Sequence, residues 1–64
     1  SVYIATAGGN KLLLDEDTGG ISLTDQNGNS IAMTKDGIAI KSAGVLTIEA
    51  SKEVTLTGSK VNIK

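Results

Sequence analysis

The sequence lacks the two residue types that most often staple a small fold. It contains no cysteine and no histidine, so a disulfide framework and a structural metal held by those side chains are both excluded. A domain of 64 residues buries only about 60% of the surface that its unfolded chain exposes, which makes a lone monomer marginal. We therefore expect oligomerisation to stabilise it.

An excess of charge and a long apolar run are also missing. Six basic residues stand against seven acidic ones, for a net charge of -1. This balance provides no basic field for nucleic acid and no polybasic membrane anchor. No apolar run approaches the ~18 residues of a membrane-spanning helix, and the first residues do not resemble a signal peptide. The abrupt start at Ser1 leads us to expect a single domain, residues 1–64, excised from a longer chain.

What the sequence has instead is a repeated apolar triplet. Two apolar side chains separated by one residue fall on the same face of a strand. The pattern recurs eight times, and its spacing tightens to seven or eight residues between Ile38 and Ile63. The predicted core-facing residues are Val2, Ile4, Leu12, Leu14, Ile21, Leu23, Ile31, Met33, Ile38, Ile40, Leu46, Ile48, Val54, Leu56, Val61 and Ile63.

The central residues of the triplets predict that the opposite face is exposed to solvent. From the third triplet onward they are small or polar: Ser22, Ala32, Ala39, Thr47, Thr55 and Asn62. Such alternation is typical of strands with one buried face, and no helical stripe of useful length is present. We expect an all-β fold of about eight short strands, with the longer linkers 15–20 and 24–30 as protruding loops.

A hairpin is the local alternative, because Asn27-Gly28 is a strong two-residue turn signal between strands. Pairing about that turn would set Leu23 opposite Ala32. Residues directly opposite each other share a face, so the apolar pairs on either side would lie on opposite faces of the ribbon. We therefore favour a loop between sequential strands.

The period leaves two ways of winding the chain. A single-chain β-helix of this length would make too few coils to cover its own ends. In an intertwined homotrimer, three chains close a triangular β-prism, a triple-stranded β-helix, and each apolar face meets two others. The trimer is favoured because it removes the lateral sheet edges.

Several stretches carry a resemblance to a known family. They are residues 9–16 (Gly-Asn-Lys-Leu-Leu-Leu-Asp-Glu), Ile21-Ser22-Leu23, Asp36-Gly37-Ile38, Ser42-Ala43-Gly44 and Glu49-Ala50-Ser51. In this order they closely resemble the C-terminal β-prism, or needle, of the valine-glycine repeat (VgrG-type) spike proteins of type VI secretion. The chain also looks like the related central spikes of contractile phage tails.

The resemblance implies a homotrimeric needle that caps a contractile tube and pierces a target envelope. Its implied partners are the tail tube or hub through an N-terminal part absent here, a tip (PAAR-type) protein or effector at the other end, and transiently the target membrane. Assembly in the bacterial cytoplasm would be followed by secretion or injection. The motifs do not distinguish a secretion system from a phage tail.

The end of the sequence suggests where a tip protein would bind. The residues that complete the last apolar pair would leave strand edges and apolar side chains facing outward. They are Lys60, Val61, Asn62, Ile63 and Lys64. The alternative is that the natural chain continues into further repeats or an effector domain.

Two oxygen-rich runs imitate metal sites. Residues 15–20, Asp-Glu-Asp-Thr-Gly-Gly, resemble the start of a calcium loop, but its twelfth position is Gln26 rather than Glu. Asp25-x-Asn27-x-Asn29 is equally well explained by turn chemistry. We expect no metal, no cofactor and no catalytic residue, because carboxylates on a shaft lack the desolvated cleft that catalysis requires.

Two other classes of function stay open. A trimeric phage fibre or adhesin segment that binds a cell-surface receptor would be expected to carry exposed aromatic residues, and Tyr3 is the only aromatic residue in the chain. A carbohydrate-active β-helix enzyme would need a longer solenoid with a groove lined by carboxylates.

Overall fold

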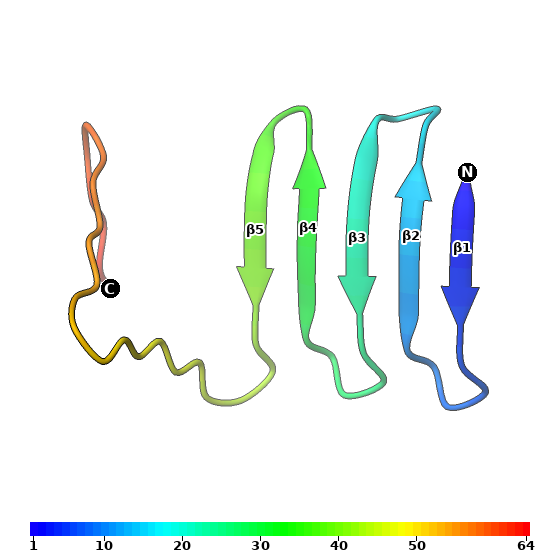
Figure 1. Cartoon of the computed structure of the whole chain (residues 1–64), viewed down its shortest axis with the longest axis horizontal. Helices are drawn as coiled ribbons and strands as arrows, with labels where there is room; N and C mark the ends of the chain where they lie inside the picture. The colour runs from blue at the N-terminus through cyan, green and yellow to red at the C-terminus, as the bar shows by residue number, and fades with distance from the viewer.

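The fold is a single-layered antiparallel sheet followed by an extended segment. The computed structural model describes all 64 residues and contains five strands, each hydrogen-bonded to the next along the chain in the order β1-β2-β3-β4-β5 (Figure 1). The strands are β1 (Val2–Ala5), β2 (Lys11–Asp15), β3 (Gly20–Thr24), β4 (Ser30–Thr34) and β5 (Gly37–Lys41). The expectation of an all-β fold is confirmed.

The register explains why each apolar triplet becomes a strand. Residues directly opposite each other share a face of an antiparallel sheet, so a continuous chain of opposite partners defines a row across all five strands. One row is Ile4, Leu12, Leu23, Ile31 and Ile40, and the next is Val2, Leu14, Ile21, Met33 and Ile38. These ten residues define the inner face of the sheet. The residue between the two inner-face residues of each strand, such as Tyr3 on β1 and Ala39 on β5, lies on the outer face.

The rejection of a hairpin around Asn27-Gly28 was wrong. Strands β3 and β4 pair antiparallel, with Leu23 opposite Ile31 and Thr24 opposite Ser30. The connection is the five-residue loop 25–29 rather than a two-residue turn. That length moves the register by one residue, which brings both apolar pairs to the same face. The error came from treating the two-residue turn as the only hairpin.

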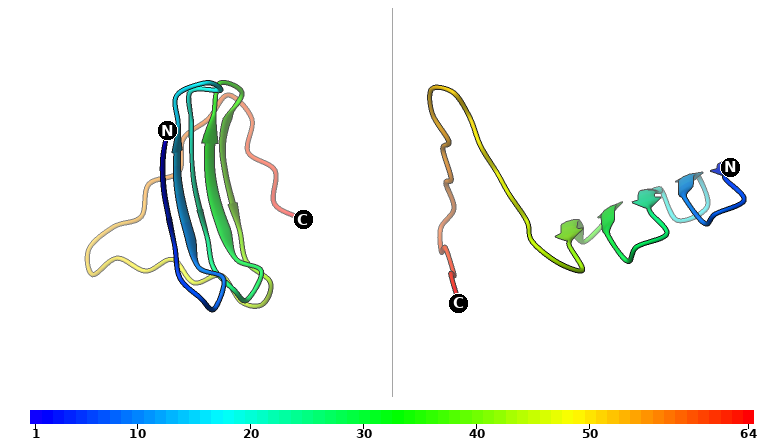
Figure 2. Two further views of the ribbon diagram at one scale, coloured as in Figure 1. Left: turned by 90° about the vertical axis from the view of Figure 1, so that its right-hand side faces the viewer. Right: turned by 90° about the horizontal axis from the view of Figure 1, so that it is seen from below.

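Of the eight short strands expected, the single chain forms the first five. The last three apolar triplets lie in residues 42–64, which form no strand. Of the 22 backbone–backbone hydrogen bonds, 19 lie within the strands, and the other three lie within loops 6–10 and 25–29. Residues 42–64 therefore make none. Figure 2 shows this segment running away from the layer of strands. A strand needs a hydrogen-bonded neighbour, and a single chain offers these residues none.

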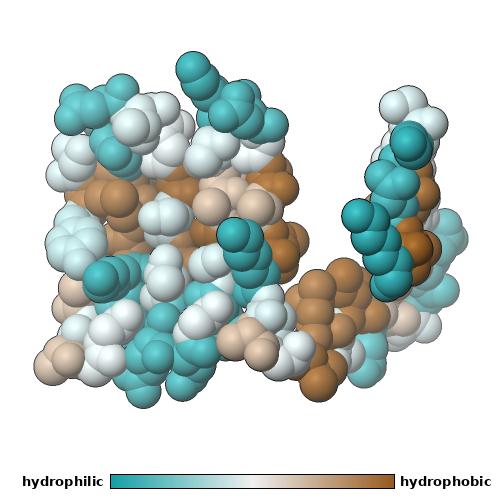
Figure 3. All heavy atoms as spheres, turned by 180° about the vertical axis from the view of Figure 1, so that it is seen from behind, coloured by the Kyte–Doolittle hydropathy of each residue, from teal (hydrophilic) through white to brown (hydrophobic).

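One chain by itself has no core. None of the 64 residues is buried, and inner-face side chains such as Ile38 are up to 70% exposed. Hydrophobic residues cross the middle of the strands and gather again on the segment that follows the sheet, whereas hydrophilic residues lie toward the strand ends (Figure 3). No helix suited to crossing a membrane occurs in the structure.

Candidate functional site

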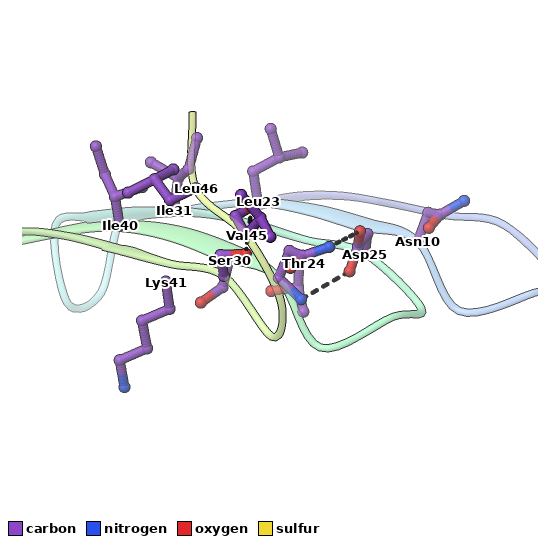
Figure 4. Close-up of a pocket in the computed structure, with 12 residues that line it drawn as sticks. Asn10, Leu23, Thr24, Asp25, Ser30, Ile31, Ile40, Lys41, Val45 and Leu46 are labelled. Carbon is purple, nitrogen blue, oxygen red and sulfur yellow. Dashed lines mark hydrogen bonds between the residues drawn. The ribbon is translucent and has the colours of Figure 1, made fainter. Parts of the chain in front are cut away.

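The inner face opens into an apolar hollow at the β5 edge of the sheet. Its volume is about 520 Å³, and its apolar lining is Leu23, Ile31, Ile40, Val45 and Leu46. Figure 4 shows Leu23, Ile31 and Ile40 rising from one side of the sheet beside Leu46, whereas Lys41 points to the opposite side. Apolar side chains that line an open hollow are a surface suited to packing against another apolar surface rather than to binding a polar substrate.

Loop 25–29 contributes Asp25 and Asn29 to the polar rim of this hollow, and the loop is organised by the Asp25 carboxylate. The Oδ1 atom of Asp25 accepts hydrogen bonds from the backbone N–H of Asn27 at 2.9 Å and of Asn29 at 2.8 Å. Its Oδ2 atom accepts from the side-chain amide of Asn29 at 2.8 Å and from that of Asn27 at 3.4 Å. The loop thereby pairs the backbone N–H groups of Asn27 and Asn29 with its own carboxylate and reverses the chain in five residues.

These bonds lower the pKa of Asp25. Hydrogen bonds to the charged form of a carboxyl favour ionisation. The Asn29 side-chain amide is the main cause, followed by the backbone N–H groups of Asn29 and Asn27, and together they lower the pKa of Asp25 from 3.8 to about 2. The carboxylate therefore remains an acceptor throughout the neutral and mildly acidic range.

Two asparagines join successive loops at this end of the sheet. The Oδ1 atom of Asn10 accepts the backbone N–H of Gln26 at 3.0 Å, and the Oδ1 atom of Asn29 accepts the backbone N–H of Ala43 at 2.8 Å. Loops 6–10 and 25–29 and the start of residues 42–64 are thus linked in sequence. We call these two bonds the asparagine clamps. The second one holds the start of the unpaired segment against the sheet.

The turn between β2 and β3, expected as an acidic surface turn, contains the first imitation of a metal site. The Oδ1 atom of Asp15 accepts the backbone N–H groups of Asp17 at 3.0 Å and of Thr18 at 3.5 Å. Hydrogen bonds from Thr18, above all from its side chain, lower the pKa of Asp15. No group of three or more His, Cys, Asp or Glu residues in the structure is arranged to hold a metal ion.

The proposed tip-docking residues, Lys60 to Lys64, lie at the end of the unpaired segment. Val61 is 47% exposed and Ile63 is 87% exposed, and neither takes part in a backbone–backbone hydrogen bond. The structure does not bring them next to the apolar hollow, which is lined by residues from 10 to 46. Docking at this end and burial of the sixteen predicted core residues both stay predictions.

Sequence reasoning missed the asparagine clamps, although the sequence carries a signal for them. The loops Thr6-Ala7-Gly8-Gly9-Asn10 and, 19 residues later, Asp25-Gln26-Asn27-Gly28-Asn29 both end in Gly-Asn and both begin with a side chain that carries an acceptor oxygen. In both loops the first side chain accepts the backbone N–H of the final asparagine. The glycine before that asparagine has a positive φ, 107° at Gly9 and 93° at Gly28, a region that favours glycine. A search for a 19-residue repeat would have indicated paired loops.

Comparison with known proteins gives one family. The family model described as the phage baseplate V C-terminal trimerisation domain matches residues 1–64. The comparison with curated proteins found no match. The matched range includes both the sheet and the unpaired residues 42–64, so the family description applies to both parts of the chain.

Proposed function

Because the chain belongs to the phage baseplate V C-terminal trimerisation domain family, we propose that it forms the shaft of a membrane-piercing spike in a contractile injection machine. Family membership supports a homotrimer and a structural role in a phage-type tail or baseplate. The membrane-piercing role, the prism arrangement and the docking of a tip protein are the parts that we propose.

The observation that carries the proposal is the surface that one chain leaves uncovered. The accessible surface area of the whole chain is 5781 Å², for a mass of 6.5 kDa. A folded monomer of that mass is expected to expose about 3,800 Å². The excess of about 2,000 Å² per chain is of the size that obligate assemblies bury. A surface of this extent supports a chain that completes its fold only with its partners.

In the proposed assembly, three inner faces meet around a common axis and close a triangular β-prism. Residues 42–64 of each chain find their missing backbone partners on the other chains, which turns the last three apolar triplets into strands. Pairing between chains would also cover the two free sheet edges, β1 and β5, and unpaired edges otherwise invite aggregation.

The proposed role is mechanical rather than catalytic. The hollow is apolar, and the hydrogen bonds that most lower the pKa of Asp25 and Asp15 come from neighbouring residues of the same turn, which is typical of structural turns. The resemblance of the sequence to valine-glycine repeat spikes favours a shaft that is assembled in the bacterial cytoplasm and then driven into a target envelope. A type VI spike and a phage tail spike are both compatible with this role.

The function can be tested with two variants in the full-length spike. Ile40 lies on the inner face opposite Ile31, so Ile40→Asp would place three unpaired carboxyls in one layer of the core, which is far costlier than exposing them to water. Thr47→Asp is the control, since Thr47 lies between the predicted inward residues of its triplet. We expect Ile40→Asp to abolish permeabilisation of target cells and Thr47→Asp to preserve it. Normal permeabilisation by Ile40→Asp particles would contradict the proposal.

Tip docking is tested separately by capture of the cognate tip protein. Deleting residues 61–64 removes the exposed Val61 and Ile63 and is expected to abolish capture while sedimentation still reports a trimer. Replacing Lys52, which lies in the same unpaired segment but outside this terminus, is the control and is expected to leave capture intact. Unchanged capture by a trimer without residues 61–64 would rule out docking at this end.

A further inference from the structure

Loop 25–29 contains an asparagine–glycine pair whose reacting groups are exposed and weakly held. We propose that Asn27 is a site of spontaneous deamidation in the folded protein and that this modification loosens the asparagine clamp to residues 42–64. The proposal rests on the loop itself and does not depend on the spike function.

The chemistry requires only the chain and water. The backbone nitrogen of Gly28 loses its proton to hydroxide and attacks the side-chain carbonyl carbon of Asn27. The C–N bond of the side-chain amide breaks as its nitrogen takes a proton from water, so ammonia leaves, hydroxide is regenerated and a five-membered imide closes. Water then adds to either imide carbonyl and opens the ring. The products are aspartate and isoaspartate, the latter with one extra backbone carbon, and no oxidant or reductant is needed.

The geometry leaves both reacting groups accessible. Asn27 and Gly28 are exposed, and the Gly28 nitrogen donates no hydrogen bond within the strands or loops. Gly28 has no side chain to hinder the attack, and its φ is 93°. The side-chain amide of Asn27 is held only by the 3.4 Å bond to Asp25, whereas that of Asn29 is held at 2.8 Å.

The other asparagines are internal controls. Asn10 is followed by Lys11 and Asn29 by Ser30, and each has its Oδ1 atom engaged in a clamp. Asn62 is exposed but precedes Ile63, whose β-branched side chain crowds the attacking nitrogen. Only Asn27 combines a side-chain amide held by a single long hydrogen bond, a following glycine and a backbone nitrogen on that glycine that donates no hydrogen bond.

Deamidation of Asn27 adds a negative charge next to the Asp25 carboxylate that organises the loop. A carboxylate at position 27 would lie beside Asp25, whose own carboxylate holds both the backbone and the side chain of Asn29. Like charges so close repel each other. Asn29 in turn accepts the N–H of Ala43 at 2.8 Å, so disturbing the Asp25 network weakens the bond that holds the start of residues 42–64.

The reactivity is tested by incubating the assembled protein at mildly alkaline pH and mapping its peptides by mass spectrometry. We expect an amide-to-acid mass change at Asn27, with isoaspartate among the products, while Asn10 and Asn29 keep their amides. A parallel sample unfolded in guanidinium gives the rate of Asn27 deamidation in the unfolded chain. If Asn27 reacts only in the unfolded sample, or no faster than Asn29 in the folded one, the proposal is wrong.

The consequence is tested with a matched pair of variants, Asn27→Asp as the product and Asn27→Gln as an uncharged side chain that can close only a slowly formed six-membered imide. Hydrogen exchange of the Ala43 amide reports the second clamp directly. We expect faster exchange in Asn27→Asp than in Asn27→Gln, with the exchange of the β2 amides the same in both. Equal exchange at Ala43 would show that deamidation leaves the clamp intact and would overturn this part of the proposal.

Discussion

Replacing Ile31 by alanine isolates what the inner face contributes to assembly. Ile31 lies on β4 opposite Leu23 on one side and Ile40 on the other, and it is 40% exposed in the single chain. If three inner faces meet, three copies of this side chain are buried in one layer. A buried large-to-small change of this kind costs about 2–5 kcal/mol. The trimer should therefore lose about 6–15 kcal/mol, because the change occurs three times.

Even the lower bound has a large measurable effect. A loss of about 6 kcal/mol corresponds to roughly a 10⁴-fold weaker association, since each 1.4 kcal/mol is tenfold. Ala32→Ser is the matched control on the same strand, because Ala32 lies on the outer face opposite Ser22 and Ala39. A surface change of this kind is expected to stay within about 0.5 kcal/mol.

The assay is urea unfolding followed by far-ultraviolet circular dichroism at several protein concentrations. Because folding is coupled to assembly, the midpoint should rise with concentration for the wild type and for Ala32→Ser. Ile31→Ala should shift the midpoint strongly downward at every concentration. Equal midpoints for the two variants would refute the assignment of Ile31 to a shared core.

Three further outcomes are expected. Gly28→Ala should lower the free energy of unfolding by about 1–2 kcal/mol per chain, because a residue with a Cβ is strained at φ 93° and that Cβ would lie 3.3 Å from the Cβ of Ala43. Gly44→Ala is the control: a Cβ there meets nothing within 4 Å, so the variant should be neutral in the same melts. The pKa of Asp25 is lowered from 3.8 to about 2, so the stability that this carboxylate contributes is complete above pH 3.8 and is lost as the pH falls through about 2. Asp25→Asn should therefore reduce the dependence of the melting temperature on pH in that window. An unchanged pH dependence would show that the loop carboxylate does not cause the loss of stability in acid. Asn29→Ala should speed hydrogen exchange at the Ala43 amide, with which its Oδ1 atom is hydrogen-bonded, and unchanged exchange would show that this clamp does not hold the segment in solution.

The apolar alternation was enough to predict the strand positions but not their partners. The pairs Ile21/Leu23 and Ile31/Met33 marked β3 and β4 correctly, because the two-residue period of a strand is a local property. Which residue faces which depends on loop length, and Asn27-Gly28 suggested a two-residue turn where the Asp25 carboxylate in fact organises five residues. The strongest local turn signal was therefore the misleading one.

In the second half of the chain, the sequence pattern predicts strands that the single chain does not form. The triplets there, such as Leu46-Thr47-Ile48, recur regularly every seven or eight residues, yet they form no strand in the single chain. Local pattern predicts the tendency to be a strand, whereas hydrogen bonding needs a neighbour. No residue in the sequence specifies whether that neighbour is the same chain or another. The proposed tip docking at Ile63 depends in the same way on a surface that another molecule would provide.

The mass of the particle in solution tests the central claim most directly. Sedimentation equilibrium of the chain at micromolar concentration should give three times 6.5 kDa, with no folded species of lower mass on dilution, because separation of the chains would expose the inner face and leave residues 42–64 unpaired. A compact, folded particle of 6.5 kDa would contradict the account.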